Sequence, residues 1–175
     1  MPFSIANMEG VDVTATYSID TTKPEYPAPP FAVGTRATGS DNSEYVFVKN
    51  AAATASAAGD VFYFVPTTFA ATKLSTSNDA RGNLVGVAVS AIPGTTGTVT
   101  GYGWAQVKGQ ATASVLTLAA ANVRLNTTAT AGSLDDDGTA GSMQVQGIYL
   151  TTANSGGTTA ATACIMNYPF VDVTL

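Results

Sequence analysis

The chain contains no histidine and only one cysteine among its 175 residues. Without histidine it lacks the commonest general base, and a Ser-His-Asp arrangement is impossible. Most zinc and iron sites need histidine or several cysteines, so these centres are also excluded. A disulfide framework is excluded too, and we expect Cys164 to be a small buried apolar side chain. An intermolecular bridge and a reactive thiol are the alternatives.

Charge is also scarce. Charged residues make up 11% of the chain, whereas soluble proteins average about 25%. The seven basic residues are scattered singly and the net charge is −5, so nucleic acid is excluded as a partner. Thr, Ala and Gly take the place of charge, and the neutral surface that results is typical of proteins that pack against other chains.

Long apolar runs are absent. No segment approaches the roughly 18 apolar residues that a membrane-spanning helix needs, and no membrane partner is expected. The first ten residues, MPFSIANMEG, lack the basic start and apolar centre of a signal peptide. We therefore expect synthesis in the cytoplasm without secretion.

Acidic residues offer little for catalysis. The three glutamates, Glu9, Glu25 and Glu44, are far apart, and no acid pair lies in an apolar motif of the kind that glycoside hydrolysis needs. Asp135–Asp137 followed by Gly138 is the densest acidic cluster. It is typical of a surface turn, with a calcium site as the alternative, although the EF-hand spacing is not met. We expect neither an enzyme nor a bound cofactor.

Short alternating and β-branched runs separated by Gly-rich turns dominate the rest of the chain, and they predict an all-β fold. The architecture expected is a small antiparallel β-barrel or β-sandwich with an extended N-terminal arm. The best helix candidate is the alanine-rich stretch 51–58, which is short and contains Ser and Thr. The predicted strands are 44–48, 61–65, 84–92 and 99–108 (as a hairpin), 143–151, 161–166 and 171–175.

Residues 1–30 differ from the body, 31–175. The alternation in Val11–Tyr17 predicts an edge strand with one apolar face, and four prolines between Pro24 and Pro30 predict a stiff extended connector. Such an arm is suited to add as a strand to a neighbouring sheet. The alternative is a strand folded back onto its own domain.

Four segments carry a family resemblance: 33–36 (VGTR), 44–48 (EYVFV), 84–109 (LVGVAVSAIPGTTGTVTGYGWAQVKG) and 134–150 (LDDDGTAGSMQVQGIYL). Together they resemble the small capsid decoration, or cement, proteins of tailed bacteriophages, from about Phe31 onward. The resemblance implies a structural virion protein on the outer surface of the capsid. It also implies a homo-oligomer, a trimer or else a dimer, that stabilises contacts between major capsid protein subunits.

Aromatic residues in the terminal, proline-marked segments are the best candidates for contact with a partner chain. They are Phe3, Tyr17, Tyr26, Tyr168 and Phe170. We expect Trp104 to be a core residue. The alternative function is a head-fibre or surface recognition module that binds host glycans through Trp104, Tyr102 or loop aromatics.

Overall fold

The computed structural model describes residues 10–23 and 28–174. This part of the chain is all-β: it forms eleven strands, which join in one large mixed sheet, and no helix. The all-β class predicted from the sequence is therefore confirmed.

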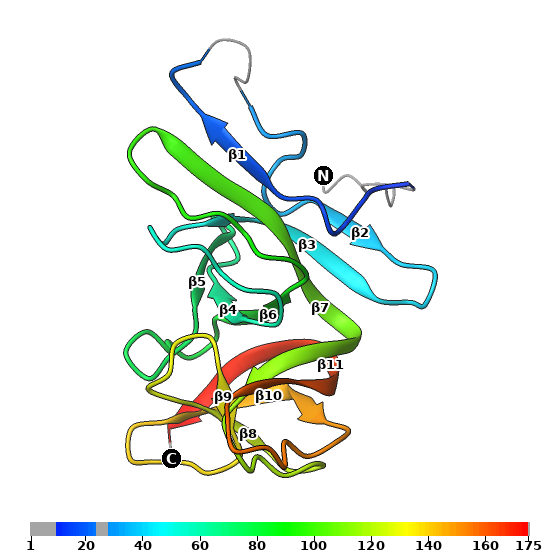
Figure 1. Cartoon of the computed structure of the whole chain (residues 1–175), viewed down its shortest axis with the longest axis vertical. Coiled ribbons are helices and arrows are strands. Elements are labelled where there is room, and N and C mark those ends of the chain that lie inside the picture. Colours follow the sequence, from blue (N-terminus) through cyan, green and yellow to red (C-terminus); the bar gives the residue numbers. More distant parts are fainter. Residues whose placement is uncertain (1–9, 24–27, 175) are drawn as a thin grey trace.

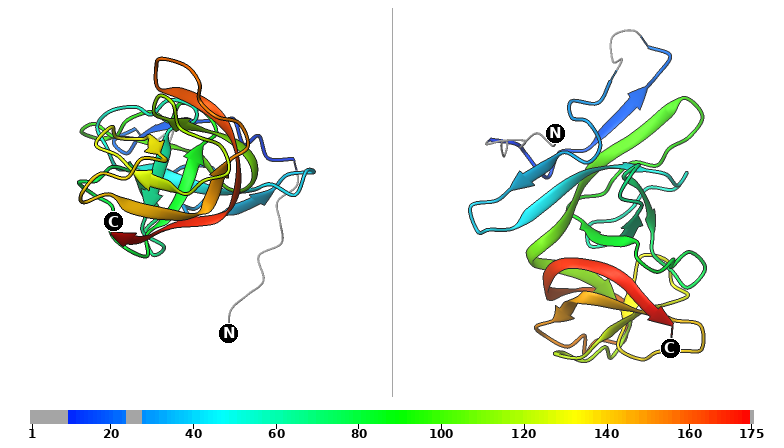
Figure 2. Two further views of the ribbon diagram at one scale, coloured as in Figure 1. Left: turned by 90° about the horizontal axis from the view of Figure 1, so that it is seen from below. Right: turned by 180° about the vertical axis from the view of Figure 1, so that it is seen from behind.

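The strands differ widely in length, from two residues to seventeen. They are β1 (Tyr17–Asp20), β2 (Arg36–Thr38), β3 (Glu44–Asn50), β4 (Val61–Phe64), β5 (Ala70–Lys73), β6 (Leu84–Ala88), β7 (Val99–Val115), β8 (Leu125–Thr127), β9 (Leu134–Asp135), β10 (Met143–Leu150) and β11 (Ala160–Thr174). In Figures 1 and 2, β1, β2 and β3 lie at one end of the molecule and β8 to β11 at the other.

Strand β7 runs between these two ends and pairs with different partners along its length (Figure 1). Its first half pairs with β1, β3 and β6, and its second half pairs with β11, from Lys108↔Asn167 to Val115↔Ala160. The change of partner occurs next to Gly109, whose φ is +95°. Such a φ favours glycine, so this residue lets one strand serve both ends.

The pairings close two circuits that share β7. One runs β7–β3–β5–β4–β6 and back to β7, and the other runs β7–β9–β8–β10–β11 and back to β7. Among the described strands, the pairs β3–β5 and β7–β9 are parallel and the others are antiparallel.

Three buried clusters of side chains correspond to this arrangement. The first circuit encloses Val46, Val48, Phe62 and Phe64 with their neighbours. A larger cluster, which includes residues of β4, β6, β8, β10 and β11, fills the second circuit and the junction. An aromatic cluster around Phe47 and Trp104 lies on β3 and β7, and residues of β1 and the preceding loop pack against it.

Several predicted strands are confirmed. β3, β4 and β10 lie within the predicted ranges or within two residues of them, and β6 and β7 pair antiparallel as the predicted hairpin requires. The predicted break between 161–166 and 171–175 is wrong: β11 continues through Pro169. Proline is tolerated there because a register shift between β10 and β11 interrupts the regular pairing beside it.

The alanine-rich stretch 51–58 is not a helix. The side chain of Asn50 organises it as a loop: its Nδ2 donates to the carbonyl of Thr54 at 3.1 Å, and its Oδ1 accepts from the amide of Ala52 at 3.0 Å. The Ser56 amide donates to the carbonyl of Ile92. These bonds replace helical ones.

The edge strand predicted over Val11–Tyr17 is displaced toward the C-terminus. Asp12 accepts hydrogen bonds from the amide and hydroxyl of Thr14, which makes a turn, and the strand begins only at Tyr17. Val11 and Val13 still pack against the aromatic cluster. β1 pairs antiparallel with β7 of its own chain.

Candidate functional site

Four polar side chains meet where the two circuits join. They are Arg36 on β2, Glu44 on β3, Lys108 on β7 and Tyr168 on β11, and we call them the Tyr168 cluster. The Tyr168 hydroxyl donates to Glu44 Oε1 at 2.6 Å, and Lys108 Nζ lies 3.1 Å from the same oxygen. Arg36 Nη1 is 3.7 Å from Glu44 Oε2. One carboxylate therefore binds a hydroxyl and two cations.

The backbone of β11 explains why Tyr168 reaches Glu44. Tyr168 has a φ of +48°, a conformation that side-chain-bearing residues rarely adopt. On the facing strand, Gly147 has a φ of +76°, and a Cβ at that position would lie 2.7 Å from the carbonyl oxygen of Asn167. This irregularity re-aims the side chain of Tyr168, as β-bulges commonly do.

The cluster has a defined electrostatic character. The hydrogen bond from Tyr168, followed by the interactions with Lys108 and Arg36, lowers the pKa of Glu44. The same hydrogen bond raises the pKa of Tyr168, and the bond to Glu44 raises the pKa of Lys108. The two cationic groups also lie near the aromatic ring, with Arg36 Cζ 5.9 Å and Lys108 Nζ 5.8 Å from its centroid.

An apolar cavity of about 190 Å³ adjoins the cluster. Its lining combines Val46, Phe64, Leu84, Val85, Val107 and Pro169 with the exposed side chains of Arg36 and Tyr168. An apolar cavity bordered by tyrosine and arginine is suited to receive an anchoring side chain of a protein partner, because these residue types dominate interface energetics.

Acid–base chemistry fits the cluster poorly. A general acid at neutral pH needs a carboxyl group whose pKa is raised, commonly by burial in apolar surroundings. The pKa of Glu44 is lowered instead, and its oxygens are occupied by donors.

The aromatic contact candidates fall into three groups. Tyr168 and Phe170 are both exposed, at 40% and 39%, and they flank the buried Pro169 on β11. Tyr17 is half-buried on β1, and its ring packs edge-on against Phe47 at 6.0 Å. Phe3 and Tyr26 lie outside the described residues. Of the three candidates that the structure describes, Tyr168 and Phe170 share β11 and Tyr17 lies on β1.

The sequence did not indicate the charged members of the cluster. Arg36, Glu44 and Lys108 are isolated charges in strand segments, separated by up to 72 residues from one another and by 60 or more from Tyr168. Only the register, with Glu44 opposite Lys108 and Arg36 opposite Val46, brings them together. Alternation alone does not predict such pairing between strands.

Trp104 is a core residue, as predicted: it is 1% exposed and packs against Phe47 and Phe31 at 5.1 and 5.3 Å between ring centroids. Tyr102 is half-buried and stacks on the other side of this group, 5.9 Å from Phe47. Neither ring forms an exposed ledge.

The acidic segment forms the end of β9 and the bends after it. Burial raises the pKa of Asp135, and Asn126 donates to the carbonyl of Asp136. Within residues 10–23 and 28–174, no group of three or more acidic or cysteine side chains is placed to hold a metal ion. Cys164 is fully buried, which confirms the prediction for this residue.

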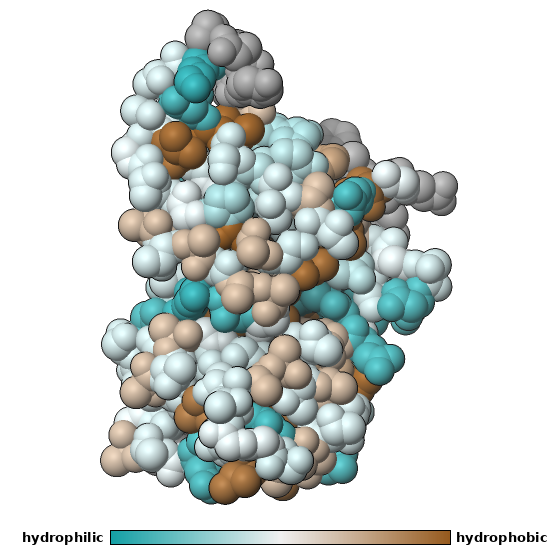
Figure 3. Space-filling model, viewed as in Figure 1, coloured by the Kyte–Doolittle hydropathy of each residue, from teal (hydrophilic) through white to brown (hydrophobic). Residues whose placement is uncertain are grey.

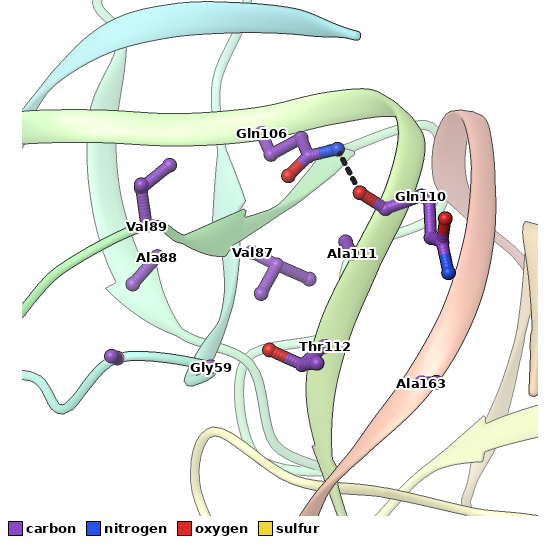
Figure 4. A pocket seen from close by; sticks show the side chains of 10 residues that line it. Gly59, Val87, Ala88, Val89, Gln106, Gln110, Ala111, Thr112 and Ala163 are labelled. Carbon is purple, nitrogen blue, oxygen red and sulfur yellow. Dashed lines mark hydrogen bonds between the residues drawn. The ribbon is translucent and has the colours of Figure 1, made fainter. Parts of the chain in front are cut away.

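A second hollow, of about 390 Å³, lies along the junction between β6, β7 and β11 (Figure 4). Small side chains such as Ala88, Ala111 and Ala163 line it, together with Gln106, whose Nε2 donates to the carbonyl of Gln110 at 2.8 Å. Its lining includes no titratable side chain, so it offers no acid or base.

No protein-family model, curated protein or solved structure matches this chain. In the described ranges, no helix has the length and apolar character to cross a membrane.

Proposed function

We propose that this chain is a structural virion protein that binds the outer surface of a tailed-phage capsid as a homo-oligomer and stabilises contacts between major capsid protein subunits. The observation that carries the proposal is the exposed Tyr168, which lines an apolar cavity and binds a carboxylate that also pairs with two cations; Phe170, two residues further along β11, is exposed as well. The family resemblance of the sequence supplies the identity of the partner.

The surface supports a contact role. Most of the face in Figure 3 has intermediate hydropathy, with small separate polar and apolar areas. Charged groups are depleted at the centres of permanent interfaces. Four of the seven basic side chains, those of Arg36, Lys73, Arg81 and Lys108, are engaged in ion pairs within the chain, which leaves little free positive charge for nucleic acid.

The proposal also includes the arrangement of the strands into barrels and an N-terminal arm. The two closed circuits of pairing support two small barrels that share β7, with β1 and the segment before it as the attached part of an N-terminal arm. Multiple copies of such a rigid body would each bridge neighbouring subunits. Because the protein binds the assembled lattice, mass action favours that lattice over its dissociated states.

The test uses undecorated heads built from the major capsid protein of the same phage. We expect the purified protein to bind them and raise their melting temperature, and light scattering with size exclusion to give a trimer, or else a dimer. The double variant Tyr168→Ala/Phe170→Ala should bind more weakly. Tyr149→Ala removes another exposed aromatic ring, 45% exposed, and should bind as the wild type does.

Two results would reject the proposal. One is a head that binds the protein and melts at an unchanged temperature, because stabilisation is then absent. The other is a stable monomer that does not bind heads at all. If the double variant and the wild type bound heads equally well, Tyr168 and Phe170 would not be the residues that contact the capsid.

The alternative of glycan recognition through Trp104 or Tyr102 has no support in the geometry of these residues. Trp104 is enclosed by the aromatic cluster, and Tyr102 has one ring face stacked on Phe47 at an interplanar angle of 4°. A sugar would have to displace core side chains to reach the indole.

A further inference from the structure

A groove of about 460 Å³ lies along β10 and β11, beside the turn that precedes β8; it is distinct from the cavity that adjoins the Tyr168 cluster, although its Asn167 directly precedes Tyr168. We propose that this groove binds a neutral saccharide, with a pyranose ring stacked on Tyr149. Its lining includes the ring of Tyr149, the side chain of Ile165 and the amides of Asn122, Gln144 and Asn167.

Tyr149 provides the stacking surface. It is 45% exposed, more than any other tyrosine in the described residues, while its neighbours in β10, Ile148 and Leu150, are buried. The strand therefore presents Tyr149 outward. Ile165 lies directly opposite on β11, so it supports one side of the ring. An aromatic ring with an exposed apolar face and a polar hydroxyl is suited to the mixed surface of a sugar.

Amide side chains provide the polar part of the groove. Those of Asn122, Gln144 and Asn167 make no hydrogen bond to another protein group in the part of the chain that the structure describes, and the same is true of the Arg124 guanidinium. Buried amides in this fold behave differently: Asn154, for example, donates to the carbonyls of Leu116 and Thr158. Three of the four groove amides are thus free to bind a ligand, while that of Gln146 donates to Asp172 Oδ2 at 3.4 Å.

The type of these groups points to a neutral polyhydroxylated ligand. An amide offers both a donor and an acceptor, which matches a hydroxyl that also does both. The lining contains no carboxylate and one cation, Arg124, so it is not arranged to neutralise a polyanion. A protein anchor would instead favour a dry apolar pocket with few unpaired amides, which is the character of the cavity beside Tyr168.

Gly147 fixes the shape of the groove wall. It is exposed between Gln146 and Ile148, and its φ of +76° favours glycine. An added Cβ would lie 2.7 Å from the carbonyl oxygen of Asn167 and 3.1 Å from Pro169 Cα, so glycine here lets the backbones of β10 and β11 approach closely beside the groove.

The test is saturation-transfer NMR with the full chain and oligosaccharides of glucose, galactose, mannose and N-acetylglucosamine at millimolar concentration. We expect at least one to bind, and Tyr149→Ala to weaken the binding by about tenfold or more. Tyr149→Trp should restore it, and Gln144→Ala should weaken it to a smaller extent. Val65→Ala is the control, because Val65 is 39% exposed and lies outside the lining of the groove, and it should bind the sugar as the wild type does.

The proposal is overturned if none of these saccharides binds, or if binding is unchanged in both Tyr149→Ala and Gln144→Ala. It is also overturned if Tyr149→Ala abolishes binding to phage heads, because the groove is then a protein contact. Since the head-binding test relies on Tyr168 and Phe170, failure of one proposal is distinguishable from failure of the other.

Discussion

The Tyr168 hydroxyl donates a hydrogen bond to Glu44 Oε1 over 2.6 Å, which joins β11 to β3 across 124 residues of sequence. It connects a strand of one circuit to a strand of the other, beside the point where β7 changes partners. The bond therefore links the two ends of the molecule at their junction.

Tyr168→Phe tests the contribution of this bond. The substitution removes the hydroxyl and keeps the ring, so Glu44 loses its closest donor. We expect the free energy of unfolding to fall by about 1 kcal/mol, the value of an ordinary hydrogen bond and less than is usual for a charged acceptor, because the exposed tyrosine is largely solvated. Urea unfolding followed by circular dichroism at neutral pH measures the change.

Tyr149→Phe is the control for this substitution. Its hydroxyl is on an exposed side chain with no hydrogen bond to the described part of the protein, so we expect a change within about 0.5 kcal/mol. Equal effects of the two substitutions would show that the bond to Glu44 adds nothing to stability.

Acid should weaken the same link. The pKa of Glu44 is lowered from 4.5, first of all by the Tyr168 hydroxyl, so the folded state binds fewer protons than the unfolded chain at this carboxyl. Its stabilisation is therefore present above pH 4.5 and is lost as the pH falls through the lowered pKa. We expect the difference in unfolding free energy between wild type and Tyr168→Phe to shrink over that range.

Urea titrations of both proteins at a series of pH values measure this difference. Asp12, Asp20 and Asp41 also have lowered pKa values, but they contribute equally to the two proteins and cancel. A difference that stays constant from neutral pH down through the acid range would contradict the assigned role of Glu44.

Gly109→Ala should be among the most damaging single-methyl additions. The residue has a φ of +95°, and an added Cβ would lie 2.3 Å from Ser43 Oγ and 2.9 Å from Ser43 Cα. Backbone strain and overlap together predict a loss of about 3 kcal/mol or more in the free energy of unfolding. Thermal and urea unfolding measure the effect.

Gly141→Ala is the matched control. Its φ is +87°, but no atom lies within 4 Å of the position of the added Cβ, so only the backbone term of about 1 kcal/mol remains. If the two variants lost the same stability, the close contact between Gly109 and Ser43 would be refuted.

The strands with clear alternation could be predicted from the sequence. Glu44–Asn50 and Val61–Phe64 are rich in β-branched and aromatic residues and are bounded by turn residues, which is a local signal. The burial of Trp104 agrees with the prediction too, but alternation does not account for it: β7 is buried on both faces from Gly103 to Val107, with Trp104 in the aromatic cluster and Ala105 in the core of the first circuit.

The partners of those strands could not be predicted in the same way. The sequence predicts β7 only as one strand of a hairpin. In the structure, the strand continues through Gly109 and its second half pairs with β11. Pro169 suggests a strand end, whereas the chain passes it at a bulge. Both features depend on contacts between residues distant in sequence, and so does the Tyr168 cluster. Register is fixed by the packing of the whole sheet and not by any one segment.

Asn50→Ala tests why the alanine-rich stretch is a loop. Asn50 is 1% exposed, and its side chain donates to the carbonyls of Thr54 and Pro93 and accepts from Ala52. Without it these buried groups lose their partner, and we expect a loss of about 2 to 3 kcal/mol in the free energy of unfolding.

Thr54→Ala is the control. Its side chain is exposed and makes no hydrogen bond to the described residues, so stability should change by less than about 0.5 kcal/mol. A neutral Asn50→Ala would mean that the backbone alone holds the loop. Circular dichroism would show whether helix appears when the side chain is removed.

Cys164 should be almost unreactive in the folded protein. It is fully buried among the side chains of the second circuit, and burial raises the pKa of its thiol to about 11. Since the thiolate is the nucleophile, reaction with a disulfide reagent at mildly alkaline pH requires β11 to open first. We expect slow labelling of the native protein and immediate labelling of one thiol per chain in denaturant. Rapid labelling of the native protein would show that β11 is not stably paired with β7 and β10.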